Sequence, residues 1–145
     1  MAQSRRIVVT LQSVLESVDL AEGVALSISE AAGFDEGDRH KIGMAVREAV
    51  INALQYGNQM SPEKTVRLTL ALEPDRLMIQ VLDQGSGFDL SDVPDPLAEE
   101  NLLKASGRGI LLMRSFMDEF SVARSPEGGA ELSMSKLYPA VRSVG

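Results

Sequence analysis

The chain opens with a short β-branched run that is followed by a stretch of helical periodicity. Residues 5–11, RRIVVTL, predict a strand. From about residue 13 to residue 32, apolar side chains recur every three or four positions, which predicts an amphipathic helix. Gly33 is the expected stop signal, because glycine readily adopts the left-handed conformation that ends many helices.

A second helix is expected directly after the first. Asp35 or Asp38 can cap its first turn, and the periodicity continues to Tyr56, before a Gly-Asn pair at 57–58 that is typical of a helix end. Its apolar positions form one arc that we expect to face a sheet: Ile42, Val46, Ala49 and Ala53.

Two pairs of strand-like runs occupy much of the remaining chain. The pair at 64–73 and 75–83 surrounds a Glu-Pro-Asp turn, and the pair at 119–125 and 130–137 surrounds PEGG, so each pair predicts a hairpin. Residues 84–109 connect the hairpins and hold four glycines and two prolines. A connection of this length predicts a functional loop or a lid. It leads into a third predicted helix, at 109–117, that starts just after a glycine pair.

The predicted order is therefore strand, helix, helix, hairpin, helix, hairpin. Strands joined by short turns pair antiparallel, and the helices then cover one face of the sheet, which gives a two-layer α/β sandwich of the α+β type. Strands and helices do not alternate regularly, as a doubly wound parallel sheet requires. No repeat or linker divides the sequence, so residues 1–145 are expected to form a single domain.

Composition and charge narrow the function mainly by exclusion. Hydrophobic residues make up 44% of the 145 residues and charged residues 24%, as in ordinary globular proteins. The chain has no cysteine, which excludes disulfides and favours a cytoplasmic location, and its single histidine excludes a multi-histidine metal site. A net charge of −7 disfavours direct binding to nucleic acid. Without a long apolar run or a signal-peptide pattern, no membrane association is expected.

Glu48 and Asn52 form a polar strip on the second predicted helix, away from its apolar arc. Four residues apart, they project side by side, and Met44 and Ile51 flank them, so the pair is not expected on a fully wet surface. The segment alone favours a solvated helix edge. The alternative is chemical, because an amide oxygen is a suitable ligand for a cation bridged to phosphate and a carboxylate can deprotonate a hydroxyl.

The segment VLDQGSGF contains a second group of candidates. Asp83 ends a predicted strand, and Gly85 and Gly87 follow it at alternate positions, where glycine permits close approach of the backbone to a ligand. A carboxylate in this place can accept a hydrogen bond from the exocyclic amine of adenine. An ordinary glycine-rich turn is the alternative, and the spacing is not that of a Rossmann fingerprint.

The segment SGRGILLM contains a third group. Gly107 and Gly109 flank Arg108 immediately before the third predicted helix. A helix N-terminus offers free N–H groups and the positive end of a dipole to phosphate, and glycine lets phosphate oxygens come close. Loop flexibility before a helix explains the glycines equally well, and the segment is not a Walker loop.

In their order along the chain, the three segments resemble the N box and the two glycine boxes of the GHKL superfamily of ATP-binding domains. Within this superfamily, EAVINALQYGN, DQGSGFD and GRGILLMRSFMDEF look most like the bacterial anti-sigma-factor serine/threonine-protein kinases, over about residues 7–138. The resemblance implies the Bergerat fold, a mixed and mostly antiparallel sheet covered on one face by three helices.

The resemblance also implies a role for each candidate. Asn52 would bind the Mg²⁺ ion that bridges the triphosphate of ATP, Glu48 would be the catalytic base, and Asp83 would accept a hydrogen bond from the adenine amine. The other nucleotide-binding positions would be Gly85, Gly87 and Phe88 near the base, and Gly107, Arg108, Gly109 and Ile110 near the phosphates.

Two places depart from the family pattern. Ala130 and Glu131 stand where the family often has a threonine that supports the adenine pocket. Tyr56 stands where a histidine often follows the N-box asparagine. These departures bear on nucleotide affinity and on the exact activity more than on the fold.

The implied function is that of an anti-sigma factor with ATP-dependent protein-serine/threonine kinase activity. The chain would phosphorylate a hydroxyl of an anti-sigma-factor antagonist, release it and then sequester a sigma factor, with a homodimer expected from the family. An alternative is an ATP-binding switch without kinase activity, which Ala130 and Glu131 slightly favour. A gyrase-like hydrolase is a third possibility, but no transducer domain is evident. Glu48 disfavours a histidine-kinase catalytic domain, where an asparagine is expected.

Overall fold

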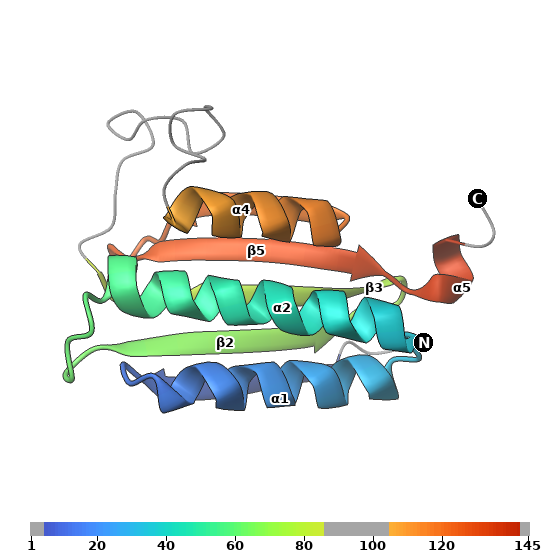
Figure 1. Cartoon of the computed structure of the whole chain (residues 1–145), viewed down its shortest axis with the longest axis horizontal. Helices are drawn as coiled ribbons and strands as arrows, with labels where there is room; N and C mark the ends of the chain where they lie inside the picture. Colours follow the sequence, from blue (N-terminus) through green and yellow to red (C-terminus); the bar gives the residue numbers. More distant parts are fainter. Residues whose placement is uncertain (1–4, 86–104, 143–145) are drawn as a thin grey trace.

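A sheet of five strands forms one layer of the molecule and helices form the other (Figure 1). The computed structural model describes residues 5–85 and 105–142, with the backbone alone for 105–108. The strands are β1 (Arg5–Gln12), β2 (Thr65–Leu72), β3 (Arg76–Leu82), β4 (Glu119–Arg124) and β5 (Ala130–Leu137). The helices are α1 (Glu16–Ala31), α2 (Glu36–Asn52), the π-helical turn η1 (Ala53–Gly57), α4 (Ala105–Phe116) and the short α5 (Pro139–Arg142).

The strand order in the sheet is β1-β2-β3-β5-β4, and every neighbouring pair is antiparallel. Both predicted hairpins are present, as β2–β3 and β4–β5. The two-layer α+β sandwich is therefore confirmed. Within the described part of the chain the sheet contains no parallel pair, so it is more uniform than the mixed sheet implied by the family resemblance.

The helices α1, α2 and α4 lie side by side on one face of the sheet, with α2 in the middle (Figure 1). The predicted apolar arc of the second helix is buried, with Ile42 and Val46 at 0% exposure and Ala49 at 1%. It packs on alternate residues of the central strands, which include Leu68 of β2 and Ile79 of β3. The core thus lies between α2 and the middle of the sheet.

Local sequence signals set most of the element ends. Gly33 has a φ of +90°, in the left-handed region that favours glycine, and it follows the end of α1 as predicted. Asp35 caps α2, because its Oδ1 accepts a hydrogen bond from the backbone N–H of Asp38 at 2.8 Å. The regular part of α2 ends at Asn52, earlier than the predicted Tyr56, because the next five residues form the wider turn η1.

The start of α4 differs from the prediction. The helix begins at Ala105, so Gly107 and Gly109 lie inside its first turns and not ahead of them. Because glycine is a poor helix former, the sequence pattern predicted that the helix begins later than it does. Packing of α4 against α2 outweighs this local preference.

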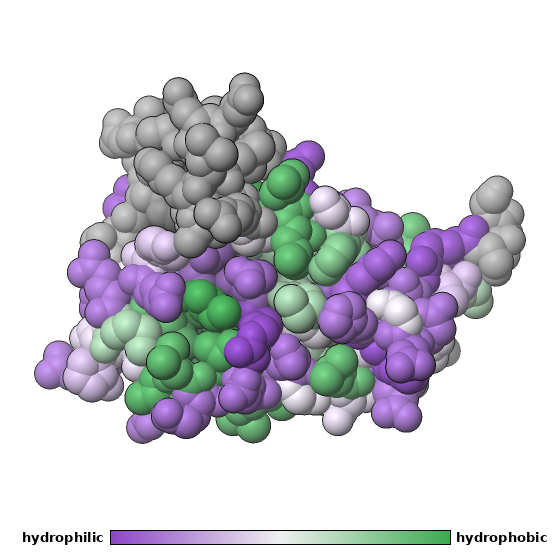
Figure 2. Space-filling view, viewed as in Figure 1, coloured by the Kyte–Doolittle hydropathy of each residue, from purple (hydrophilic) through white to green (hydrophobic). Residues whose placement is uncertain are grey.

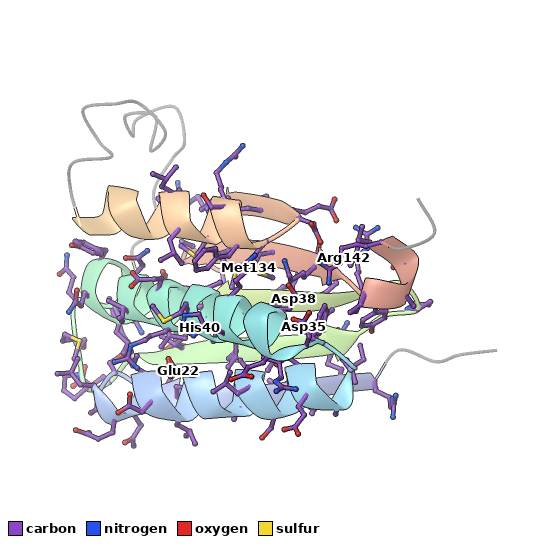
Figure 3. The ribbon with its side chains drawn as sticks, turned by 45° about the vertical axis from the view of Figure 1, so that its right-hand side comes forward. Glu22, Asp35, Asp38, His40, Met134 and Arg142 are labelled. Atoms are coloured by element: carbon purple, nitrogen blue, oxygen red, sulfur yellow. The ribbon has the colours of Figure 1, made fainter. Side chains whose placement is uncertain are left out.

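The C-terminal end of the described chain is tied to the start of α2. Figure 3 shows Arg142 of α5 beside Asp38, with which it forms an ion pair. The hydrogen bond to Asp38 and the charges of the neighbouring carboxylates raise the pKa of Arg142, and they outweigh desolvation, which lowers it. A second hydrogen bond attaches the same region to the turn between β2 and β3. The hydroxyl of Tyr138 donates to the backbone oxygen of Glu73 at 2.6 Å.

The part of the helical face that Figure 2 shows in colour is mostly polar, with one apolar patch at the lower left and a second at the upper centre. None of the helices in residues 5–85 and 105–142 is long and apolar enough to cross a membrane.

Candidate functional site

The pair Glu48 and Asn52 lies in the C-terminal half of α2, where α4 packs against it. Both side chains are half-buried. A Cβ atom built on Gly109 of α4 would lie 2.9 Å from Glu48 Oε2 and 3.3 Å from Asn52 Nδ2. Only the absence of a side chain at position 109 therefore lets the first turns of α4 approach the two polar groups. The structure thus brings the first and third predicted segments together.

Neither Glu48 nor Asn52 has a hydrogen bond or ion pair to another side chain within the described part of the chain. A half-buried carboxylate beside an amide is unfavourable unless a partner is supplied. Lys41 and Gln55 extend the polar strip of Glu48 and Asn52 at its two ends, and both are exposed. The solvated-edge explanation therefore fits the ends of the strip, whereas its middle faces α4 and has capacity for a ligand.

Asp83 directly follows β3 and is only 7% exposed. Its Oδ1 accepts hydrogen bonds from the backbone N–H groups of Gly85 and Ala130, each at 3.0 Å. Its own N–H donates to the backbone oxygen of Ala130 at 3.1 Å. Its Oδ2 has no hydrogen-bond partner among the described residues. One oxygen is therefore fixed by the protein, and the other is left to accept from a ligand.

Three glycines pack closely around Asp83. A Cβ built on Gly57, the last residue of η1, would lie 2.1 Å from Asp83 Oδ2, and one built on Gly129 would lie 2.0 Å from the backbone oxygen of Asp83. A Cβ on Gly85 would lie 2.2 Å from the backbone oxygen of Gly57. In the sequence, Gly57 is predicted to end a helix and Gly129 to lie in a hairpin turn. Their contacts with Asp83, which is far away in the sequence, leave no pattern in the neighbouring residues that could predict them.

The turn η1 joins the two halves of the site. It begins next to Asn52 and ends at Gly57, against Asp83. A π-helical turn at the end of an α-helix often marks a functional site, because it widens the helix and redirects the side chains. The Glu48–Asn52 pair thus lies next to the start of η1, and Asp83 lies against its last residue.

The remaining predicted positions are placed as follows. Gly107 and Arg108 belong to the backbone of α4, whose first N–H groups have no acceptor within the helix. Ile110 is half-buried and packs against the core. Gly87 and Phe88, with most of the predicted loop at 84–109, lie outside the described residues, and their roles stay predictions.

The two departures from the family pattern have different surroundings. Ala130 provides both a backbone N–H and a backbone oxygen to Asp83, and neither contact needs a particular side chain. Tyr56 is 54% exposed, on the outside of η1. The backbone support of Asp83 is therefore retained even though position 130 has no hydroxyl.

The side-chain donors at this site fit a metal ion that is held mainly by a bound small molecule and only in part by the protein. Among residues 5–85 and 105–142, no group of three or more histidine, aspartate or glutamate side chains could enclose an ion. Mg²⁺ usually keeps several waters and is held by one or two protein oxygens together with substrate phosphates. The Asn52 side-chain oxygen fits that kind of site.

A family model described as a histidine kinase-like ATPase domain matches residues 11–136. The chain belongs to the histidine kinase-like ATPase family. The matched range contains α2, η1, the end of β3 and α4, and so it covers every described part of the site.

Two relatives of this chain come from Bacillus licheniformis. An anti-sigma F factor is 34% identical over 98 residues, which cover 66% of this chain and 67% of the relative. The serine-protein kinase RsbW is 32% identical over 115 residues, which cover 75% of this chain and 71% of the relative.

A solved structure supports the fold of the ATPase domain. The crystal structure of the RsbU and RsbW domains of Rv1364c from Mycobacterium tuberculosis matches with a TM-score of 0.61 and 18% identity. The match covers 92% of this chain, and this chain spans 32% of the length of that larger protein.

Replacement of Gly129 by alanine tests the close packing around Asp83. The new Cβ would lie 2.0 Å from a backbone oxygen, so the end of β3 or the β4–β5 turn must move. We expect Gly129→Ala to weaken ATP binding at least about tenfold and to lower the free energy of unfolding by about 1–3 kcal/mol. Nucleotide titration and thermal unfolding measure both effects.

The matched control is Gly23→Ala in α1, where a new Cβ meets nothing within 4 Å. It is expected to leave ATP binding unchanged and to stabilise the helix by about 0.5–1 kcal/mol. Unchanged ATP binding by Gly129→Ala would show that the packing around Asp83 does not set nucleotide affinity.

Proposed function

We propose that this chain is an anti-sigma factor that transfers the γ-phosphate of ATP to a serine or threonine of an anti-sigma-factor antagonist. The observation that supports this most is the close approach of Gly109 to Glu48 and Asn52. It joins a candidate base and a candidate metal ligand to a helix N-terminus, the three parts that phosphoryl transfer requires. The names of the relatives, anti-sigma F factor and serine-protein kinase, point to the same function.

Each group has a separate task in this proposal. Glu48 takes the proton of the substrate hydroxyl, whose oxygen forms a bond to the γ-phosphorus while the bond to the bridging β,γ-oxygen breaks and ADP leaves. Asn52 holds Mg²⁺, which when bound neutralises charge on the phosphates. The first N–H groups of α4 hold phosphate oxygens, and Asp83 accepts a hydrogen bond from the adenine amine.

The charge of the chain supports the release step. Phosphorylation adds about 1.5–2 negative charges to the antagonist. The chain itself has a net charge of −7, so a phosphorylated antagonist is repelled more strongly than an unmodified one. Its departure frees the surface on which a sigma factor is held. We propose a homodimer as the active form, on the family resemblance, and sedimentation equilibrium would measure it.

The test is a partner-exchange experiment with the purified chain, its antagonist, the sigma factor and Mg-ATP. We expect the antagonist to gain one phosphate by mass spectrometry and to leave the chain, and the sigma factor to co-elute with the chain in size-exclusion chromatography. ATP binding without phosphate transfer would indicate a nucleotide-dependent switch without kinase activity. Absence of nucleotide binding would contradict both functions.

A further inference from the structure

Asn58, the residue after η1, is the most completely buried polar side chain next to the site, at 1% exposure. Its Nδ2 donates to the hydroxyl of Ser13 at 3.1 Å and to the backbone oxygen of Thr65 at 3.0 Å. Its Oδ1 accepts from the backbone N–H of Gln84 at 2.7 Å. One amide thus joins three segments: the turn after β1, the start of β2 and the turn after β3.

The segment after Asp83 is held by two different side chains. The N–H of Gln84 donates to Asn58, and the N–H of Gly85 donates to Asp83. The side-chain oxygen of Gln84 also accepts from the backbone N–H of Thr65 at 2.7 Å. Position 84 is therefore fixed through both its backbone and its side chain.

The orientation of the Asp83 carboxylate depends on this segment. Two N–H groups hold its Oδ1, one from Ala130 of β5 and one from Gly85. The Ala130 group is part of the sheet, whereas the Gly85 group stays in place only if Gln84 does. Removal of the Asn58 oxygen would leave Gln84 held by its side chain alone and would loosen its backbone, and with it one of the two hydrogen bonds that orient Asp83.

The chain around Asn58 is also held in an unusual conformation. The next two residues, Gln59 and Met60, have φ values of 53° and 56°, in the left-handed region that non-glycine residues rarely adopt. The backbone N–H of Met60 donates to the oxygen of Leu54 at 2.8 Å, which closes the turn that follows η1. This closed turn directs the Asn58 side chain inward, towards the strand ends.

We infer that Asn58 is a positioning residue for nucleotide recognition, which acts through Gln84 and Gly85 on the carboxylate of Asp83. The inference rests on the proposed function, because it assigns the Asp83 site to the adenine base. It predicts that Asn58 sets the affinity for ATP and has little effect on the transfer step, because Glu48 and Asn52 lie on α2 beside α4.

The test compares two substitutions that separate positioning from stability. Asn58→Ala removes the acceptor for Gln84, and we expect it to raise the Kd and the KM for ATP about tenfold, with kcat at saturating ATP within about twofold of wild type. Asn58→Asp retains an oxygen for Gln84 but places a carboxylate against the Thr65 carbonyl. It is expected to unfold at a lower temperature than Asn58→Ala and yet to bind ATP more tightly.

The control is Tyr138→Phe, which removes one hydrogen bond beside α5, at the end of the sheet opposite η1 (Figure 1). It is expected to leave ATP binding unchanged. The inference is overturned if Asn58→Ala binds ATP like wild type below its unfolding temperature, or if affinity follows thermal stability across all three variants. If Asn58→Ala does not fold, Gln84→Pro at the exposed neighbouring position, which removes the N–H that donates to Asn58, must weaken ATP binding, and wild-type affinity there overturns the inference.

Direct measurement of ATP binding by calorimetry keeps this test separate from that of the proposed function. If wild type binds ATP but transfers no phosphate, the kinase proposal fails and the ranking of the Asn58 variants still decides the inference. If wild type binds no ATP, both are overturned.

Discussion

Glu48→Gln is expected to lower the rate of phosphate transfer to the antagonist by about 10²–10⁴-fold, the usual contribution of a general base. The amide has almost the same shape as the carboxylate but cannot take the proton of the substrate hydroxyl. The side chain is half-buried, and its Oε2 lies next to Gly109, so an isosteric replacement keeps the packing between α2 and α4. The affinity for ATP should stay within about twofold, since Asp83 and Asn52 are unchanged.

Single-turnover transfer from radiolabelled ATP, with nucleotide affinity measured separately, distinguishes the two effects. The matched control is Glu36→Gln in the first turn of the same helix, where the side chain is exposed. It should transfer phosphate at the wild-type rate. A Glu48→Gln variant that retains most of the activity would exclude Glu48 as the base.

Asp83→Asn is expected to weaken ATP binding by about 10–100-fold, the effect of one lost hydrogen bond to a charged group. The structure fixes how an asparagine must orient. The N–H groups of Gly85 and Ala130 both donate to Oδ1, so the amide oxygen has to take that place. The amide NH₂ then takes the place of Oδ2, where it would face the adenine amine, donor against donor.

Competition between ATP and GTP for the Asp83→Asn variant tests the direction of this effect. The O6 atom of guanine is an acceptor, so GTP should lose less affinity than ATP and the preference for ATP should fall. The control is Asp19→Asn on α1, and it is expected to leave the affinity for ATP unchanged. The side chain of Asp19 is 80% exposed and forms an ion pair with Arg47. Equal ATP binding by Asp83→Asn and wild type would remove Asp83 from the base-recognition site.

The parts of the fold that the sequence predicted correctly are those with local causes. The left-handed φ of Gly33 and the hydrogen bond from Asp38 to the Asp35 cap are formed within a few residues of chain. The hairpins follow from strand runs on either side of a turn, and burial of Val46 follows from helical periodicity. Each of these features depends on its own segment, so a pattern in that segment is enough to predict it.

The parts that the sequence did not predict depend on contacts between distant segments. The early start of α4 follows from its packing on α2, which local helix propensity does not include. The bond between Asn58 and Gln84 spans 26 residues, and the bond between Ala130 and Asp83 spans 47. Asn58 therefore looked like an ordinary helix-end residue in the sequence.

The candidate site shows the same division. The residue types at Glu48, Asn52 and Asp83 suggested their chemistry, but no spacing within one segment could show that Gly109 lies against the first two. The family resemblance supplied that expectation through the order of its motifs. The structure adds the reason that position 109 is a glycine: a side chain there would collide with the candidate base.

The most direct test of the central claim follows the γ-phosphate of radiolabelled ATP in a mixture of the wild-type chain, Mg²⁺ and the antagonist. We predict that the label moves to a serine or threonine of the antagonist, one phosphate per molecule, and that this transfer is lost with Glu48→Gln. Label that stays in ATP while ATP is bound, or that appears as free phosphate at a rate independent of the antagonist, would contradict the claim that this chain is a protein kinase.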